Sequence, residues 1–391
     1  MQIRKLMPED MAAMSRAQSI SFMYPLNPDK SDTDEHIYSW GAFDDEGTLI
    51  SGLLNFPLPI YYDGHTVGMG GVGGVISLPE GRMRGNIRNI FRAVFDEIRG
   101  YGGIFSMLFP FSRAYYWKFG YEVCHAAHTY AFPTEQLKAF RQTGEARLHL
   151  PGDSDAAFRS IREQYARRYN CAGARTDMAW KWVLSGDPYK CESYRYILAK
   201  GGRDVAYCMF RSIKMAEFSY DMVLTEFAFV GPEAFHSLLG FLHKFGAQYE
   251  NIRFEAPSDL HPAVFLPEAV NLRVTGTQHA MARVVDVEQA LQLMRHPGGT
   301  GAYRIAIADD FLPENAGTYS VRYGPDGVDV QKGAMDAPCD LHVSVQAFAQ
   351  LCLGFCALPA ALLRPDVKLF ENRETLEKVF IEKPRAHLDR Y

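Results

Sequence analysis

Several absences narrow what this chain of 391 residues can be. No run of apolar residues approaches the ~18 that a membrane-crossing helix needs, and the N-terminus has no secretory pattern. The formal net charge of −5 leaves no basic excess of the kind that coats nucleic acid. We therefore expect a cytoplasmic protein without a membrane or nucleic-acid partner.

Cysteine is also sparse, and no histidine cluster completes a zinc set. The seven cysteines are odd in number and scattered: Cys124, Cys171, Cys191, Cys208, Cys339, Cys352 and Cys356. Such usage is typical of reduced thiols in the cytoplasm. We expect no disulfide framework and no metal.

The Gly-x-x-x-x-Gly-Lys-Ser/Thr loop of common nucleotide-binding proteins is missing as well. A different phosphate-binding pattern is present from Val75 to Arg88, where an apolar strand ends in a turn and a helix follows, which we expect to begin at Arg82. A helix N-terminus exposes unpaired N–H groups, and Arg82, Arg84 and Arg88 supply the positive charge that suits phosphate. The alternative is an ordinary strand-to-helix turn with solvated arginines.

We call this phosphate-binding segment, residues 75–88, the cradle. The helices and strands expected around it alternate as in an α/β domain. Before the cradle, we expect a helix over residues 11–21 and strands over residues 40–44, 49–62 and 65–76. After it, we expect a strand over residues 103–109, a short helix over residues 113–119 and a strand over residues 121–132.

The rest of the chain falls into two further parts. Residues 145–282 repeat the rhythm of strands and helices without a second cradle, including a strand expected over residues 215–230. This suits either a duplicated domain that lost its site or an α/β accessory domain. From Arg283 the pattern changes, with a hairpin turn at Asp326-Gly327 and a helix over residues 344–353.

Three segments carry a resemblance to a known family. Arg82-Met83-Arg84-Gly85-Asn86-Ile87 resembles the coenzyme A motif Arg/Gln-x-x-Gly-x-Gly/Ala of the GNAT N-acetyltransferases, in the form seen in the Eis family. It departs at Ile87, where a small residue is usual, and at Met83, where that family often carries another arginine. The segment from Tyr115 to Tyr121 resembles the Tyr-x-x-x-Gly-Phe/Tyr motif, and residues 310–319 resemble the sterol-carrier-like domain of the Eis family.

The resemblance implies a mixed α+β and α/β fold with two tandem GNAT-like domains and a sterol-carrier-protein-like C-terminal domain. Residues 1–143 would form the GNAT domain with the acetyl-CoA site, residues 144–282 a degenerate GNAT-like domain, and residues 283–391 the third domain. Members of this family assemble as hexamers, so we expect a homohexamer.

The implied activity is acetyl transfer from acetyl-CoA to a primary amine of an aminoglycoside, a polyamine or a protein lysine by direct attack. Tyr116 falls on the family's general acid, and its neighbour Tyr115 is the competitor. A phenol with an ordinary pKa near ~10 stays protonated and can donate to a thiolate. In the family the C-terminal carboxylate, here that of Tyr391, serves as the base, whereas an ordinary terminus is frayed.

Binding residues follow from the same motifs. The strand over residues 72–77 should pair with the pantetheine arm, with a backbone N–H near Val75 as oxyanion donor, while residues 105–108 diverge from it. We expect eight residues to bind the coenzyme: Val75, Ile76, Ser77, Arg82, Met83, Arg84, Gly85 and Asn86. For the amine we expect Asp32, Glu35 and Trp40, although such a charged loop is more often simply solvated.

A different class of function competes with this one. The C-terminal domain could carry an apolar molecule while the acetyltransferase half is vestigial. The retained cradle and Tyr116 argue against that alternative.

Overall fold

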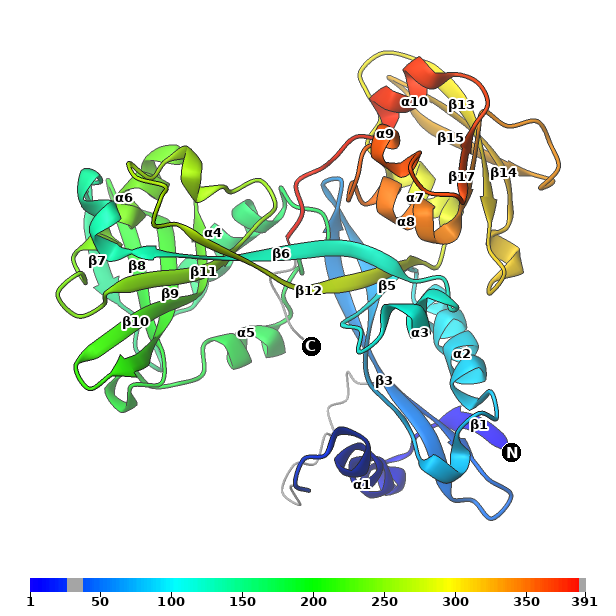
Figure 1. Ribbon diagram of the computed structural model, residues 1–391, viewed down its shortest axis with the longest axis horizontal. Coiled ribbons are helices and arrows are strands. Elements are labelled where there is room, and N and C mark those ends of the chain that lie inside the picture. Colours follow the sequence, from blue (N-terminus) through cyan, green and yellow to red (C-terminus); the bar gives the residue numbers. More distant parts are fainter. Residues whose placement is uncertain (27–37, 387–391) are drawn as a thin grey trace. The chain divides into compact units, whose positions relative to one another are not determined.

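The computed structural model describes residues 1–26 and 38–386, which form two compact units (Figure 1). The first unit combines Met1–His125 with His279–Lys383, and the second contains Ala126–Gln278 together with residues 384–386. The chain enters the second unit within β6 (Glu122–Pro133) and returns within β12 (Arg273–Val284). Across these described residues, no helix combines the length and the apolar character that crossing a membrane requires.

In the described residues, a sheet and three α-helices make up the N-terminal part of the first unit. The strands lie in the order β1 (Gln2–Lys5), β2 (Tyr38–Phe43), β3 (Leu49–Tyr62), β4 (His65–Ser77), β5 (Gly103–Leu108) and the end of β12. Only β4 and β5 pair in parallel, as a strand–helix–strand crossover requires. Ile50 packs with the core under α2 and Leu49 with the core under α1 (Met11–Phe22), because adjacent strand residues point to opposite faces.

Helix α2 (Asn86–Gly100) packs its apolar side into the core on its face of the sheet. Its buried residues recur at the predicted spacing of three and four: Ile87, Ile90, Phe91, Val94, Phe95 and Ile98. The predicted start at Arg82 was wrong, because Met83 (φ 61°) and Gly85 (φ 77°) adopt left-handed conformations that a right-handed helix cannot include. Residues 82–85 therefore form a loop in front of the helix.

The C-terminal part of the first unit contains the second sheet of the chain. Its strands lie in the order β15 (Gly327–Gly333), β14 (Gly317–Gly324), β13 (Gly301–Ala308), β16 (Leu341–Ser344) and β17 (Val367–Leu369). Four helices accompany them: α7 (Val287–Leu293), α8 (Val345–Cys352), α9 (Leu358–Ala361) and α10 (Arg373–Val379). The predicted hairpin at Asp326-Gly327 is confirmed by the pairing of Gly324 with Gly327.

The second unit has the sheet order β6, β11 (Asn251–Ala256), β10 (Ser219–Phe229), β9 (Arg203–Ala216), β8 (Tyr194–Lys200) and β7 (Glu145–Leu148). Its helices are α4 (Ala156–Ala166), α5 (Asp177–Val183) and α6 (Pro232–His243). A single strand over residues 215–230 was wrong: β9 turns into β10 at Glu217-Phe218, and Ala216 pairs with Ser219. Neither turn residue is a glycine, proline or asparagine, so the sequence gives no signal there.

Candidate active site

The parallel pair β4–β5 opens at one end. Pairing runs from Gly68 with Gly103 to Val72 with Leu108, where β5 ends. β4 continues to Ser77 and pairs there only with β3. The prediction that residues 105–108 diverge from β4 was wrong, because these residues pair with residues 69–72 and β5 ends at Leu108. One side of the β4 backbone over residues 73–77, beyond the end of β5, is open to an extended ligand.

A bulge distorts β4 at this open end. Between the pairs Gly52–Ile76 and Leu54–Gly73, one residue of β3 faces two residues of β4, Gly74 and Val75. Gly74 has a φ of +54°, and a Cβ there would lie 2.6 Å from Nε2 of Gln18, so the position requires glycine. Bulges redirect the backbone next to them. This bulge therefore changes the direction of the backbone N–H groups near Val75.

The loop after β4 leads into the N-terminus of α2. A 3-10 turn covers Pro79–Gly81, and Gly85 occupies the N-cap position of the helix. The N–H of Asn89 donates to the carbonyl of Gly85 at 3.2 Å, so the N–H groups of residues 86–88 come before the first N–H that donates within the helix. With no atom within 4 Å of a Cβ at Gly85, this end of the helix can accept an anion closely.

Asn86 fixes the loop from beneath. Its side chain is buried, and Nδ2 donates to Ser51 Oγ at 3.3 Å and to the Gly81 carbonyl at 3.1 Å. In the described part of the chain, its Oδ1 has no hydrogen-bond partner. A buried acceptor in this state is an available contact for a ligand N–H or O–H group.

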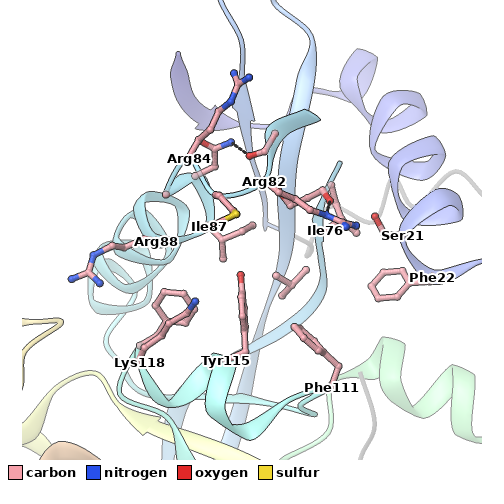
Figure 2. A pocket seen from close by; sticks show the side chains of 17 residues that line it. Ser21, Phe22, Ile76, Arg82, Arg84, Ile87, Arg88, Phe111, Tyr115 and Lys118 are labelled. Atoms are coloured by element: carbon pink, nitrogen blue, oxygen red, sulfur yellow. Dashed lines mark hydrogen bonds between the residues drawn. The ribbon is translucent and has the colours of Figure 1, made fainter. Parts of the chain in front are cut away.

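These features border one pocket of about 740 Å³ (Figure 2). All eight residues predicted to bind the coenzyme line it, namely Val75, Ile76, Ser77, Arg82, Met83, Arg84, Gly85 and Asn86. The other lining residues are Ser21, Phe22, Gly81, Ile87, Arg88, Phe111, Tyr115, Lys118 and Phe119. The lining thus holds four basic side chains and no acidic one among the residues described.

The basic side chains are not equivalent. Arg82 Nε donates to the Ser77 carbonyl at 3.2 Å, which ties its stem to the end of β4. Arg88 extends away from the pocket in Figure 2, and its guanidinium lies 5.0 Å from the centroid of the Phe311 ring. Lys118, which sequence analysis missed, places Nζ 4.1 Å from the Tyr115 ring centroid. Its position inside the Tyr-x-x-x-Gly segment was the only signal for it.

The two candidate tyrosines sit on α3 (Arg113–Trp117) but face different surroundings. Tyr115 lines the pocket, and its hydroxyl points toward Ile87 at the α2 end (Figure 2). Tyr116 is 3% exposed and does not line the pocket. It belongs to the same buried cluster as Val72 and Leu108, the last pair of β4 and β5.

Burial shapes the protonation of both phenols. It raises the pKa of Tyr115, and it raises the pKa of Tyr116 further above the ordinary value, with a smaller contribution from neighbouring Tyr115. Within the described residues the Tyr116 hydroxyl makes no hydrogen bond, while its ring packs edge-on against Phe91 and Phe111. Both hydroxyls therefore remain neutral proton donors at physiological pH.

Of the residues predicted for the amine and the base, the structure describes only Trp40. Trp40 does not line the pocket: its indole N–H donates to Glu97 Oε2 at 2.8 Å, linking β2 to α2. Asp32, Glu35 and Tyr391 lie outside the described residues.

The second unit contains a related strand arrangement with a shorter connection to its helix. β10 and β11 pair in parallel from Asp221 with Asn251 to Leu224 with Phe254, and β10 runs on to Phe229. Only residues 230 and 231 separate β10 from α6, whereas residues 78–85 separate β4 from α2. On the continuing part of β10, the carboxylate of Glu226 is buried with the guanidinium of Arg175 and the Tyr207 hydroxyl.

Family models cover most of the chain. Residues 2–124 match an acetyltransferase (GNAT) domain, residues 171–284 match another acetyltransferase (GNAT) domain, and residues 287–389 match a sterol carrier protein domain. A search of curated proteins finds no match.

Solved structures match over the whole length. A GCN5-related N-acetyltransferase from Anabaena variabilis has a TM-score of 0.85 at 17% identity, over 98% of each chain. A probable N-acyltransferase from Enterococcus faecalis has 0.84 at 20%, over 98% of each chain. Eis1 from Mycobacterium abscessus has 0.84 at 19%, over 100% of each chain. At such identities the similarity is one of fold.

Proposed function

Since the chain is a GNAT N-acetyltransferase with two GNAT domains and a sterol carrier protein domain, we propose that its first domain acetylates primary amines with acetyl-CoA. One observation carries this proposal: a single pocket joins the N-terminus of α2 to the open side of β4. The first feature suits a pyrophosphate and the second suits the amides of pantetheine.

The residues present fit the parts of acetyl-CoA. The free N–H groups of residues 86–88, with Arg82 and Arg84, supply donors and charge for the pyrophosphate. Over residues 73–77, the side of the β4 backbone that does not face β3 offers donors and acceptors to the pantetheine arm. Met83 replaces an arginine that the family motif often carries, and Lys118 adds a cation elsewhere in the pocket lining. The second domain has no such cradle in its described residues, so we assign it no acetyl transfer.

The chemistry needs an oxyanion donor and an acid. As the amine nitrogen attacks the thioester carbonyl, the C–N bond forms and the C–S bond breaks. The bulged backbone near Val75 donates to the developing oxyanion. The amine loses a proton to the proposed base, the C-terminal carboxylate of Tyr391, and Tyr116 donates its proton to the departing thiolate. The carboxylate then gives its proton to solvent and Tyr116 takes one from solvent, so that both groups are restored.

We assign the proton-donating role to Tyr116 because it falls on the family's acid and shares a buried cluster with Val72 and Leu108, the last pair of β4 and β5. We assign Tyr115, which lines the pocket, to coenzyme binding.

The acceptor is an aminoglycoside, a polyamine or a protein lysine, and Asp32 and Glu35 are its proposed contacts. A thiol-release screen of amines from these three classes identifies it. The resemblance to the Eis family also supports a cytoplasmic homohexamer.

Acetyl-CoA binding tests the proposal directly. At a hundred times its dissociation constant, acetyl-CoA should stabilise the protein by ~2.7 kcal/mol in a thermal unfolding assay. Arg82→Ala with Arg84→Ala should raise the dissociation constant about tenfold, since charge-assisted hydrogen bonds are lost. The control Arg203→Ala removes an exposed arginine of the second unit and should leave binding unchanged. No stabilisation, together with a co-purifying apolar molecule, would instead favour the carrier function.

The proposed base has its own test. A short tag fused after Tyr391 should lower turnover about tenfold or more if the terminal carboxylate accepts the proton of the amine. The same tag at the N-terminus is the matched control. Full activity of the C-terminally tagged protein contradicts the assignment.

A further inference from the structure

Helix α3 is too short to be stable on its own. It spans five residues, Arg113–Trp117, and isolated helices of that length do not repay the cost of nucleation. Ser112 Oγ caps its N-terminus by accepting the N–H of Tyr115 at 3.3 Å. The position of Tyr116 therefore depends on what binds the carbonyl groups that follow the helix.

Two glutamines of α8 bind carbonyls on either side of the α3–β6 turn. Gln346 Nε2 donates to the Trp117 carbonyl at 3.0 Å, and Gln350 Nε2 donates to the Val123 carbonyl at 2.8 Å. The two side chains lie one helical turn apart and both are buried. Gln350 Oε1 accepts from Arg364 Nη1 at 3.0 Å, which orients the amide so that Nε2 faces Val123.

Arg283, at the end of β12, binds a third carbonyl. Its Nη1 donates to the Phe119 carbonyl, and its Nη2 lies 2.5 Å from Asp309 Oδ2. Both side chains of this ion pair are fully buried, at 0% and 1% exposure. Asp309 Oδ1 in turn accepts the N–H groups of Phe311 and Leu312 at 3.1 and 2.9 Å, so the pair is held by the C-terminal domain.

We propose that Gln346, Gln350 and Arg283 are positioning residues for acetyl transfer. They hold the carbonyls of Trp117, Phe119 and Val123, and through them they fix α3 so that Tyr116 meets the thioester sulfur. The inference rests on the proposed function, in which Tyr116 is the acid. It gives the sterol carrier protein domain a part in catalysis that needs no ligand of its own.

The glutamines allow a test in the full chain. Gln346→Met with Gln350→Met keeps the length and volume of both side chains but removes both donors. We expect kcat to fall about tenfold, since small displacements of a catalytic group are costly. KM for acetyl-CoA should stay within about twofold, because residues 82–86 contact neither glutamine. Gln331→Met, an exposed glutamine on β15, is the control and should change neither constant.

A double-mutant cycle separates positioning from general destabilisation. If the glutamines act through Tyr116, adding their substitution to Tyr116→Phe should lower kcat no further. Two results would overturn the positioning role. One is a combined variant whose fold-loss in kcat equals the product of the two separate losses, and the other is an unchanged kcat in the glutamine variant. If Tyr116→Phe alone keeps full activity, the acid assignment fails, and a loss of kcat in the glutamine variant would then support positioning of α3 for another of its residues.

Discussion

Replacing Tyr116 with phenylalanine is expected to lower kcat about a hundredfold and to leave KM for acetyl-CoA within about twofold. The change removes one hydroxyl from a side chain that makes no hydrogen bond within the described residues, so the fold should be retained. The loss should come from the thiolate, which then leaves without a proton. Steady-state kinetics with a thiol-release assay measures both constants.

Tyr115→Phe is the matched control, one residue away on the same helix. Because Tyr115 lines the pocket at its α2 end, its loss should raise KM for acetyl-CoA and spare kcat. If Tyr115→Phe has no activity while Tyr116→Phe is fully active, Tyr115 is the acid and the assignment of Tyr116 is wrong. Burial raises the pKa of Tyr116 above the ordinary value, so the phenol should add no descending limb to the pH–rate profile between about pH 6 and 9.5.

Replacing Gly120 with alanine should lower the free energy of unfolding by about 3 kcal/mol. Gly120 has a φ of +86°, and a Cβ there would lie 1.7 Å from Nη1 of Arg283. The guanidinium is fully buried and bound to Asp309, so it cannot move aside without leaving that carboxylate unpaired. Chemical denaturation at neutral pH gives the free energy.

Gly102→Ala is the matched control for Gly120. It has a similar φ of +75°, but nothing lies within 4 Å of its Cβ position. Only the backbone strain remains, so about 1 kcal/mol should be lost. Equal losses in the two variants would mean that Arg283 yields and that its contact with Phe119 is not a rigid one.

The residues predicted for the coenzyme share one pocket because the signals that group them are local in the sequence. Apolar spacing in α2 and the arginines before it lie within 24 residues, and all eight expected coenzyme contacts line the pocket. The helix start was misplaced because it depends on a positive φ at Met83, a residue that rarely adopts one. Methionine has a high helix propensity, so the sequence favours a helix at Met83, whereas the loop over residues 82–85 holds this residue in a left-handed conformation.

Contacts between distant parts of the chain were beyond a single sequence. Gln346 and Gln350 belong to no recognisable motif. The carbonyl groups that accept their hydrogen bonds lie more than 200 residues earlier in the chain. Trp40 was predicted to bind the amine because aromatic residues attract cations, but Glu97 engages its indole. In the same way, sequence spacing alone could not show that Tyr115 faces the pocket while Tyr116 faces the core.

The path of the chain has a consequence for synthesis. Residues 126–278 interrupt the first unit. The carbonyl of Trp117 accepts a hydrogen bond from Gln346, which lies 229 residues further along the chain. Loop closure over such a distance is slow, and an emerging chain cannot complete this unit until almost all of it has left the ribosome. A nascent or truncated N-terminal domain would thus expose α3 without its supports. If the proposed positioning role holds, acetyl transfer would require that the sterol carrier protein domain has folded onto α3.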